Sequence, residues 1–97
     1  MAQTPENRVK AVVKRILDAH EVYHFPPATG GYGRSGVPDI ICCVNGKFLA
    51  IECKAGKGRT TALQEKNLSQ ITQSGGIALV INENDVGTLK QDLVSLL

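Results

Sequence analysis

Two carboxylates and a lysine lie around a short turn in the middle of the chain. Asp39 precedes an apolar run of residues that ends at Asn45-Gly46. Glu52 and Lys54 end the run that follows. Asn-Gly is the preferred filler of a two-residue type I′ hairpin turn, because both central positions need a positive φ. Counting outward from this turn, residue by residue, predicts Asp39 directly opposite Glu52, with Lys54 on the same face.

The predicted closeness of the two carboxylates calls for a positive partner. Directly opposed side chains on antiparallel strands have Cβ atoms about 5 Å apart, and like charges there destabilise the sheet. A hard divalent cation takes oxygen ligands and is commonly held by one or two carboxylates with waters, so Asp39 and Glu52 are predicted to bind Mg²⁺ or Mn²⁺. With the ammonium of Lys54 beside them, the three groups suit cleavage of a phosphodiester. A purely structural salt-bridge cluster is the alternative.

The same residues belong to a longer pattern. Pro38-Asp39, a spacer and Glu52-Cys53-Lys54 resemble the PD-(D/E)XK nuclease signature. With residues 36–40, the run Gly58 to Thr61 and Gln64, the chain is similar over most of its length to the VRR-NUC branch, the virus-type replication and repair nuclease domains. The resemblance implies a PD-(D/E)XK nuclease-like α-β-β-β-α-β core. It also implies a metal-dependent DNA endonuclease that hydrolyses phosphodiester bonds.

The resemblance assigns roles to further residues of the site. The two carboxylates would bind the cation directly, the backbone carbonyl of Cys53 would join them, and Lys54 would position water or stabilise charge. An acidic residue on the first helix of the family approaches the metal, and Glu6 is the candidate here, although the helix dipole alone explains a glutamate in a first turn. Gln64 falls where the family has a catalytic-site glutamine. A helix-capping role is the alternative for Gln64.

Basic and aromatic residues near the motif are predicted to contact DNA. Lys57 and Arg59 follow it closely, where phosphates would approach. The alternative is a solvated loop with lysines for solubility. Residues 28–36 are too rich in glycine for regular structure. This segment is predicted to be either a flexible connector or a DNA-contacting loop, in which Tyr32 stacks on a base and Arg34 contacts a phosphate or groove.

Length and composition limit the architecture. A chain of 97 residues with 42% hydrophobic residues is too short to divide into two useful cores, so residues 1–97 are expected to form a single domain. The net charge of +2 is too small to indicate nucleic-acid binding by itself. Three cysteines at these positions suggest neither a disulfide framework nor a zinc site, and buried thiols are expected instead.

The remaining expectations concern location and assembly. No apolar stretch approaches the ~20 residues of a membrane span, and no secretory leader is visible, so an intracellular, cytoplasmic protein is expected. The resemblance implies a bacterial or phage setting. A small core favours association, and a homodimer would supply the two active sites needed to cut both strands of a duplex or junction.

Hydrophobic periodicity and turn residues predict seven elements and a mixed four-stranded sheet with helices on both faces. They are a helix from Pro5, capped by Thr4, to about His20; a short strand from Val22 to Phe25; the two hairpin strands; a helix capped by Thr60 or Thr61 and ended by Gly75-Gly76; a strand from Ile77 to Ile81; and a helix from about Asn84 that buries Val86, Leu89, Leu93, Leu96 and Leu97.

Four functions are compatible with the sequence. The resemblance implies a structure-selective nuclease that acts on branched DNA, such as a four-way Holliday junction. A nicking or restriction-type nuclease on ordinary duplex DNA is the second reading. A non-catalytic nucleic-acid-binding module with a nuclease fold is the third, and the intact carboxylate and lysine set argues against it. A small interaction domain with an accidental motif is the fourth.

Overall fold

The computed structural model describes residues 4–28 and 33–97, so the predicted contact residue Tyr32 lies outside the described part. The elements follow in the predicted order, α-β-β-β-α-β-α. They are α1 (Pro5–Ala19), β1 (Tyr23–Phe25), β2 (Ile40–Val44), β3 (Lys47–Cys53), α2 (Ala62–Gln73), β4 (Ile77–Ile81) and α3 (Val86–Leu96). The prediction of a mixed α/β sheet is confirmed.

The sheet has the strand order β1-β2-β3-β4, with antiparallel pairing up to β3 and a parallel β3–β4 pair. The hairpin between β2 and β3 turns at Asn45, with φ 51°, and Gly46, with φ 79°. These two positive φ values are those of a type I′ turn. The pairing of β2 with β3 ends at Ile40 and Ile51, so the predicted register is confirmed up to the residue that follows Asp39.

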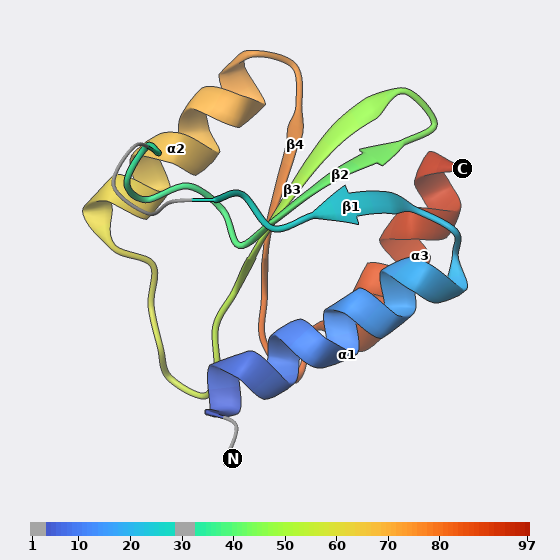
Figure 1. The fold of residues 1–97 in the computed structure, drawn as a ribbon, viewed down its shortest axis with the longest axis horizontal. Coiled ribbons are helices and arrows are strands. Elements are labelled where there is room, and N and C mark those ends of the chain that lie inside the picture. Colours follow the sequence, from blue (N-terminus) through green and yellow to red (C-terminus); the bar gives the residue numbers. More distant parts are fainter. Residues whose placement is uncertain (1–3, 29–32) are drawn as a thin grey trace.

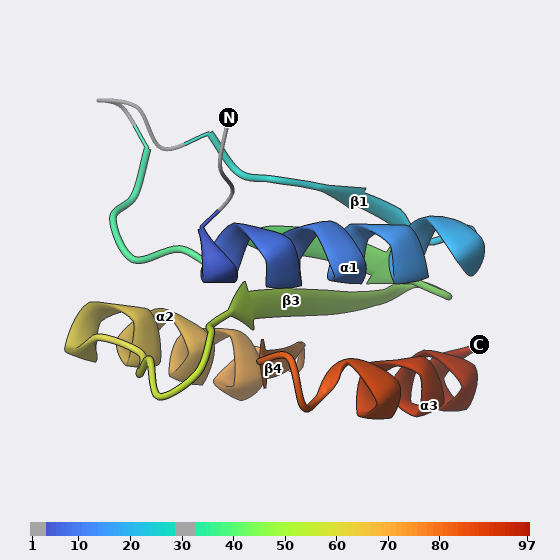
Figure 2. The same ribbon diagram turned by 90° about the horizontal axis from the view of Figure 1, so that it is seen from below.

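Helices lie on both faces of this sheet. Figure 1 shows α2 on the opposite side from α1 and α3, and Figure 2 shows α1 running alongside β1 and β3. The main core lies between the sheet and the α1–α3 pair. Its fully buried side chains include Val13 and Leu17 of α1, Ile51 of β3, and Leu89 and Leu93 of α3. Alternation along β3 therefore turns Ile51 into this core and Glu52 towards α2.

Three expectations about boundaries and burial are corrected. The last helix begins at Val86 rather than near Asn84, because Asn82 and Asp85 close a turn in which the N–H of Asn82 donates to Asp85 Oδ2 at 3.2 Å. Leu97 is 62% exposed instead of buried, since it follows the end of α3. The first strand begins at Tyr23, one residue later than predicted.

Cys43 is exposed, whereas a buried thiol was expected. The sheet register places Cys43 between Tyr23 of β1 and Phe48 of β3, and both of these rings are also exposed. On this face α2 packs against β4 and leaves the β1–β2 side uncovered. Cys42, on the other face, is buried as expected, and all three cysteines are free. None of the helices in the described part of the chain combines the length and apolar character needed to cross a membrane.

Candidate active site

Four elements bring the predicted site residues together. Glu52 lies at the end of β3, and Asp39 immediately precedes β2 beside it. Glu6 comes from the first turn of α1, and Gln64 from the first turn of α2. Lys54 follows β3 directly and contacts both Glu6 and Glu52. The hairpin and two helix N-termini therefore converge at one end of the sheet.

Glu52 is a buried carboxylate with an incomplete set of partners. It is 2% exposed. Its Oε2 accepts a hydrogen bond of 2.9 Å from Gln64 Nε2 and lies 3.4 Å from Lys54 Nζ. Its Oε1 is also buried and has no hydrogen-bond partner among the described residues. The pKa of Glu52 is raised from 4.5 to about 7, first by burial and then by the charge of Asp39, while Lys54 opposes the rise.

Asp39 is held on both of its oxygens. Its Oδ2 accepts a hydrogen bond of 2.8 Å from the backbone N–H of Cys53, which fixes the carboxylate against the end of β3. Its Oδ1 lies 3.3 Å from Lys10 Nζ. Asp39 therefore lies next to Glu52, as the register predicts. Cys53 was predicted to contribute its carbonyl, and the contact that the structure shows is made by its amide.

The loop before Asp39 needs a glycine. Gly36 has φ +75°, and a Cβ atom there would lie 2.6 Å from Leu63 Cγ and 3.1 Å from Asn67 Nδ2. Asn67 also donates to the carbonyl of Ser35, at 3.3 Å. The start of α2 therefore packs directly on the loop backbone, and this contact positions Asp39 at its end. Any side chain at position 36 would push the loop away from the helix.

Glu6 and two lysines complete a network of alternating charge. Glu6 Oε1 lies 3.8 Å from Lys54 Nζ, and Glu6 Oε2 lies 4.0 Å from Lys10 Nζ. Lys10 in turn reaches Asp39, so the network runs from Asp39 to Glu52 through two ammonium groups and one carboxylate. Lys10 was not predicted to belong to the site. Its spacing of four residues from Glu6, which puts both side chains on one face of α1, was the available signal.

Gln64 makes the contacts of a helix cap and also reaches the carboxylate of Glu52. Its backbone N–H donates to Thr61 Oγ1 at 3.2 Å, and its Oε1 accepts from the N–H of Thr61 at 2.9 Å, which together form the predicted capping box. Its Nε2 donates to Glu52. One side chain therefore caps α2 and orients the buried carboxylate.

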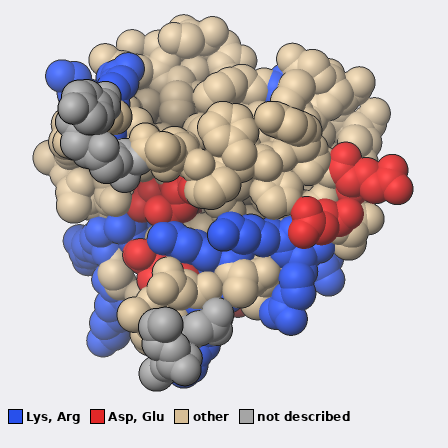
Figure 3. Space-filling view, viewed as in Figure 1, with Lys and Arg blue, Asp and Glu red and all other residues tan. Residues whose placement is uncertain are grey.

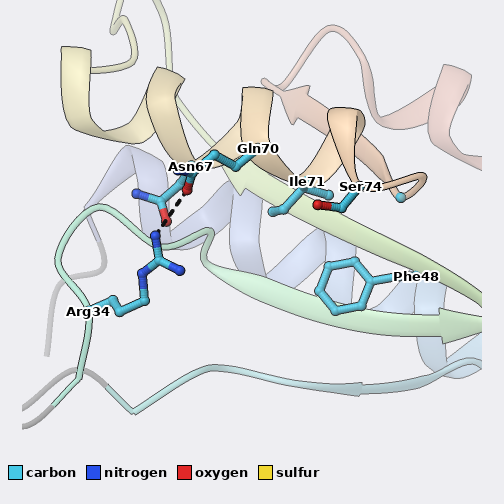
Figure 4. A pocket seen from close by; sticks show the side chains of 7 residues that line it. Arg34, Phe48, Asn67, Gln70, Ile71 and Ser74 are labelled. Carbon is cyan, nitrogen blue, oxygen red and sulfur yellow. Dashed lines mark hydrogen bonds between the residues drawn. The ribbon is translucent and has the colours of Figure 1, made fainter.

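The predicted DNA contacts lie outside this network. Lys57 and Arg59 are exposed in the loop between β3 and α2. The guanidinium of Arg34 is directed to α2 and not to a carboxylate, because its Nη2 donates to Gln70 Oε1 at 3.0 Å (Figure 4). There it lines a hollow of about 390 Å³ that also includes Phe48 and Ile71. Figure 3 shows a band of Lys and Arg side chains across one face of the molecule, with acidic side chains within and beside it.

The donor atoms of the site suit a hard cation. No cluster of three or more His, Cys, Asp or Glu residues takes up a metal-binding arrangement within residues 4–28 and 33–97. Glu6, the third acidic group, is directed to the two lysines instead. The buried Oε1 of Glu52 nevertheless has no hydrogen-bond partner among the described residues, and the oxygens of Asp39 and Glu52 are ligands that Mg²⁺ and Mn²⁺ accept.

A hairpin that holds Asp39 beside a buried Glu52, with Lys54 two residues further on and a helix on each side, defines a nuclease of the PD-(D/E)XK class. The family model described as archaeal Holliday junction resolvase (Hjc) matches residues 13–80, and the chain belongs to this family. The match includes Asp39, Glu52, Lys54 and Gln64, and it begins after Glu6 and Lys10.

Solved structures support the fold. A structure titled "VRR_NUC domain protein" superposes with a TM-score of 0.74 at 19% identity, covering 99% of this chain and 93% of its own. A second, titled "VRR_NUC domain", gives a TM-score of 0.78 at 20% identity, covering 92% of this chain and 97% of its own. The predicted likeness to VRR-NUC domains is therefore confirmed for the fold. A search of curated protein sequences found no match.

Proposed function

We propose that residues 1–97 form a single nuclease domain that hydrolyses phosphodiester bonds in branched DNA, such as a Holliday junction, with Mg²⁺ or Mn²⁺. The observation that supports this most strongly is the carboxylate of Glu52, buried beside Asp39 and Lys54 with one oxygen unpartnered among the described residues. A structural salt bridge alone would leave no reason to keep that oxygen free, because an unpaired buried charge is costly.

Asp39 and Glu52 would hold the ion, with the carbonyl of Cys53 and the carboxylate of Glu6 as the further candidate ligands. When bound, a divalent ion lowers the pKa of a coordinated water and neutralises charge on the scissile phosphate. Binding would require Glu52 in its ionised form, and because the pKa of Glu52 is raised to about 7, the affinity for the ion would increase as pH rises through this value.

The protein's own groups orient the reaction. Gln64 Nε2 holds Glu52 Oε2, and the N–H of Cys53 holds Asp39 Oδ2. This leaves Glu52 Oε1 without a partner among the described residues and Asp39 Oδ1 paired only with the ammonium of Lys10. Lys54 Nζ lies beside Glu52 and Glu6 on a side chain that is only 14% exposed. From this place it would donate to the phosphate or to the attacking water, where a fixed positive charge stabilises the transition state.

The preference for branched DNA is supported by membership in the resolvase family. Lys57 and Arg59, exposed beyond β3, would contact phosphates close to the site. Arg34 would contact the strand further away, and Tyr32 remains a predicted stacking residue. The proposed location is intracellular and cytoplasmic, in a bacterial or phage setting, which agrees with a DNA substrate.

A homodimer would bring two such sites to a four-way junction. The exposed rings on the uncovered sheet face support self-association, because Tyr23 and Phe48 expose 70% and 47% of their surface. Light scattering is expected to give twice the monomer mass. A monomer mass at working concentrations would remove the dimer from the proposal and leave the nuclease chemistry standing.

The proposal is tested with a panel of linear, nicked, flapped and four-way DNAs, with and without Mn²⁺. The parent is expected to cut the four-way substrate in the presence of Mn²⁺, and Glu52→Gln is expected to be inactive. Glu21→Gln serves as the matched control, because this substitution makes the same change of charge in an exposed turn after α1. Preferential cutting of linear duplex would support the restriction-type reading instead. Ion binding with no cleavage of any substrate would support the non-catalytic module.

A further inference from the structure

Lys10 is a charged residue of the site for which the proposed function provides no role. It lies one helical turn after Glu6 on α1, and its Nζ lies 3.3 Å from Asp39 Oδ1. Its side chain is 28% exposed. Lys10 also lines a hollow of about 480 Å³ beside the carboxylates, together with Asp39, Gln64 and Arg34. The ammonium therefore lies between the carboxylate network and an open polar hollow.

Lys10 lies on the Asp39 oxygen that a bound ion would use. The other oxygen, Oδ2, is fixed on the backbone of β3, so Oδ1 is the freer ligand. Two like charges a few ångströms apart near a protein surface are screened far less than in bulk water, and a divalent ion doubles the product of the charges. An ammonium and a divalent cation on the same oxygen therefore repel each other strongly.

The ammonium of Lys10, once displaced from Asp39, can move into this hollow. A lysine carries its charge on a flexible four-carbon stem, so its Nζ can move by several ångströms without any change in the helix. Arg34 lines the same hollow. Two basic side chains around a polar hollow suit a phosphate of a DNA strand that passes the metal site.

We propose that Lys10 is the internal counter-cation of Asp39 in the metal-free protein, that a divalent ion displaces it, and that its ammonium then contacts a DNA phosphate in this hollow. The inference rests on the proposed function. It explains how the free protein keeps Asp39 and Glu52 close together without an ion. It also makes the affinity for the ion depend on a residue that is no metal ligand.

The test compares Lys10→Met with Lys14→Met. Lys14 lies one turn further along α1 and makes no ion pair within the described residues. Calorimetry with Mn²⁺ alone, without DNA, is expected to show at least about fivefold tighter binding for Lys10→Met, because a competing positive charge is gone. Lys14→Met should bind Mn²⁺ within twofold of the parent. With saturating Mn²⁺, Lys10→Met should raise KM for the four-way DNA several-fold, since one phosphate contact is lost.

Controls for folding and for charge accompany this test. Far-UV circular dichroism checks that Lys10→Met is folded, and Lys10→Gln gives the same comparison if the methionine variant is not. Lys10→Arg keeps the charge and should bind Mn²⁺ like the parent. Unchanged or weaker binding of Mn²⁺ by Lys10→Met, in a parent that binds the ion and cuts DNA, overturns this inference alone. A parent that binds no Mn²⁺ overturns both this inference and the proposed function.

Discussion

The end of β3 and the hollow along α2 both contain a charged side chain that could act on DNA, but the surroundings of the two charges are opposite. One charge is buried and incompletely hydrogen-bonded, and the other is exposed and hydrogen-bonded. Glu52 is 2% exposed and keeps an oxygen without a partner among the described residues. Arg34 is exposed, and its guanidinium is held by Gln70 beside the apolar side chains of Phe48 and Ile71 (Figure 4).

This difference separates chemistry from binding. Burial without full hydrogen bonding costs free energy and shifts a pKa, and proteins keep such groups mainly where a reaction or an ion needs them. An exposed, hydrogen-bonded arginine costs little and contributes to affinity through charge. Substitutions at the end of β3 should therefore change the rate of cleavage, and substitutions along α2 should change the binding of DNA.

The largest effect is expected from Asp39→Asn. The substitution removes the negative charge that faces both the ion and Lys10, so cleavage of the four-way DNA should fall by on the order of 10³-fold. Single-turnover cleavage with Mn²⁺ measures this rate, and calorimetry should show weaker binding of Mn²⁺. The N–H of Cys53 can still donate to the amide oxygen of asparagine, so the variant should fold. A folded variant that cleaves at the parent rate would remove Asp39 from the site.

The second prediction concerns the stability of the metal-free protein. The pKa of Glu52 is raised from 4.5 to about 7, so between these values the native state holds a proton that the unfolded chain has lost. The free energy of unfolding should therefore fall as pH rises from about 5 to 8, by about 3 kcal/mol. Glu52→Gln should remove this part of the pH dependence and be more stable than the parent at pH 8.

Urea unfolding in the presence of a chelator, at several pH values, measures this difference. Glu21→Gln, in an exposed turn, is the control and should follow the parent curve. Added Mn²⁺ should restore stability in the parent at pH 8 and have no such effect in Glu52→Gln. A pH dependence that survives in Glu52→Gln would mean that another group titrates.

Gln64 offers a smaller effect that separates its two roles. Gln64→Glu keeps an oxygen for the N–H of Thr61 and so preserves the cap of α2, but it replaces the donor to Glu52 with a second carboxylate. Cleavage should fall by about 10- to 100-fold, and the loss of stability should be small at pH 5, where Glu52 is protonated and can share its proton with the new carboxylate. Gln64→Ala should lose both the cap of α2 and the hydrogen bond to Glu52, and its free energy of unfolding should fall by about 1 kcal/mol. Equal stability and equal rates for the two variants would contradict the double role.

The parts of this site that depend on local sequence could be predicted, and those that depend on helix docking could not. The Asn45-Gly46 turn fixes its own geometry and register, which put Asp39 beside Glu52. The capping box of Gln64 is likewise a pattern of neighbours. The contact between Lys10 and Asp39 joins α1 to a loop 29 residues away in sequence, and only the packing of α1 on the sheet decides it.

The exposure of Cys43 was missed for a similar reason. Its apolar alternation is that of a strand covered on both faces, and nothing in the sequence near it shows that α2 packs on β4 instead of on β2. Coverage of a sheet face is a property of the whole arrangement. Some side chains, such as Phe48, follow the pattern of a buried strand and are nevertheless exposed in the fold. A surface function at such residues cannot be predicted from the sequence.

The smallest effect is expected from Arg34→Gln, on the binding side of the comparison. The substitution removes one positive charge from the hollow along α2 and leaves the carboxylate network untouched. The affinity for DNA should fall several-fold at moderate salt, and the slope of log K against log salt should decrease by about 1, as for the loss of one phosphate contact. Cleavage at saturating DNA should stay within twofold of the parent. Fluorescence anisotropy at several salt concentrations measures the first effect, and a fall in the saturated rate would show that the two regions are not separable.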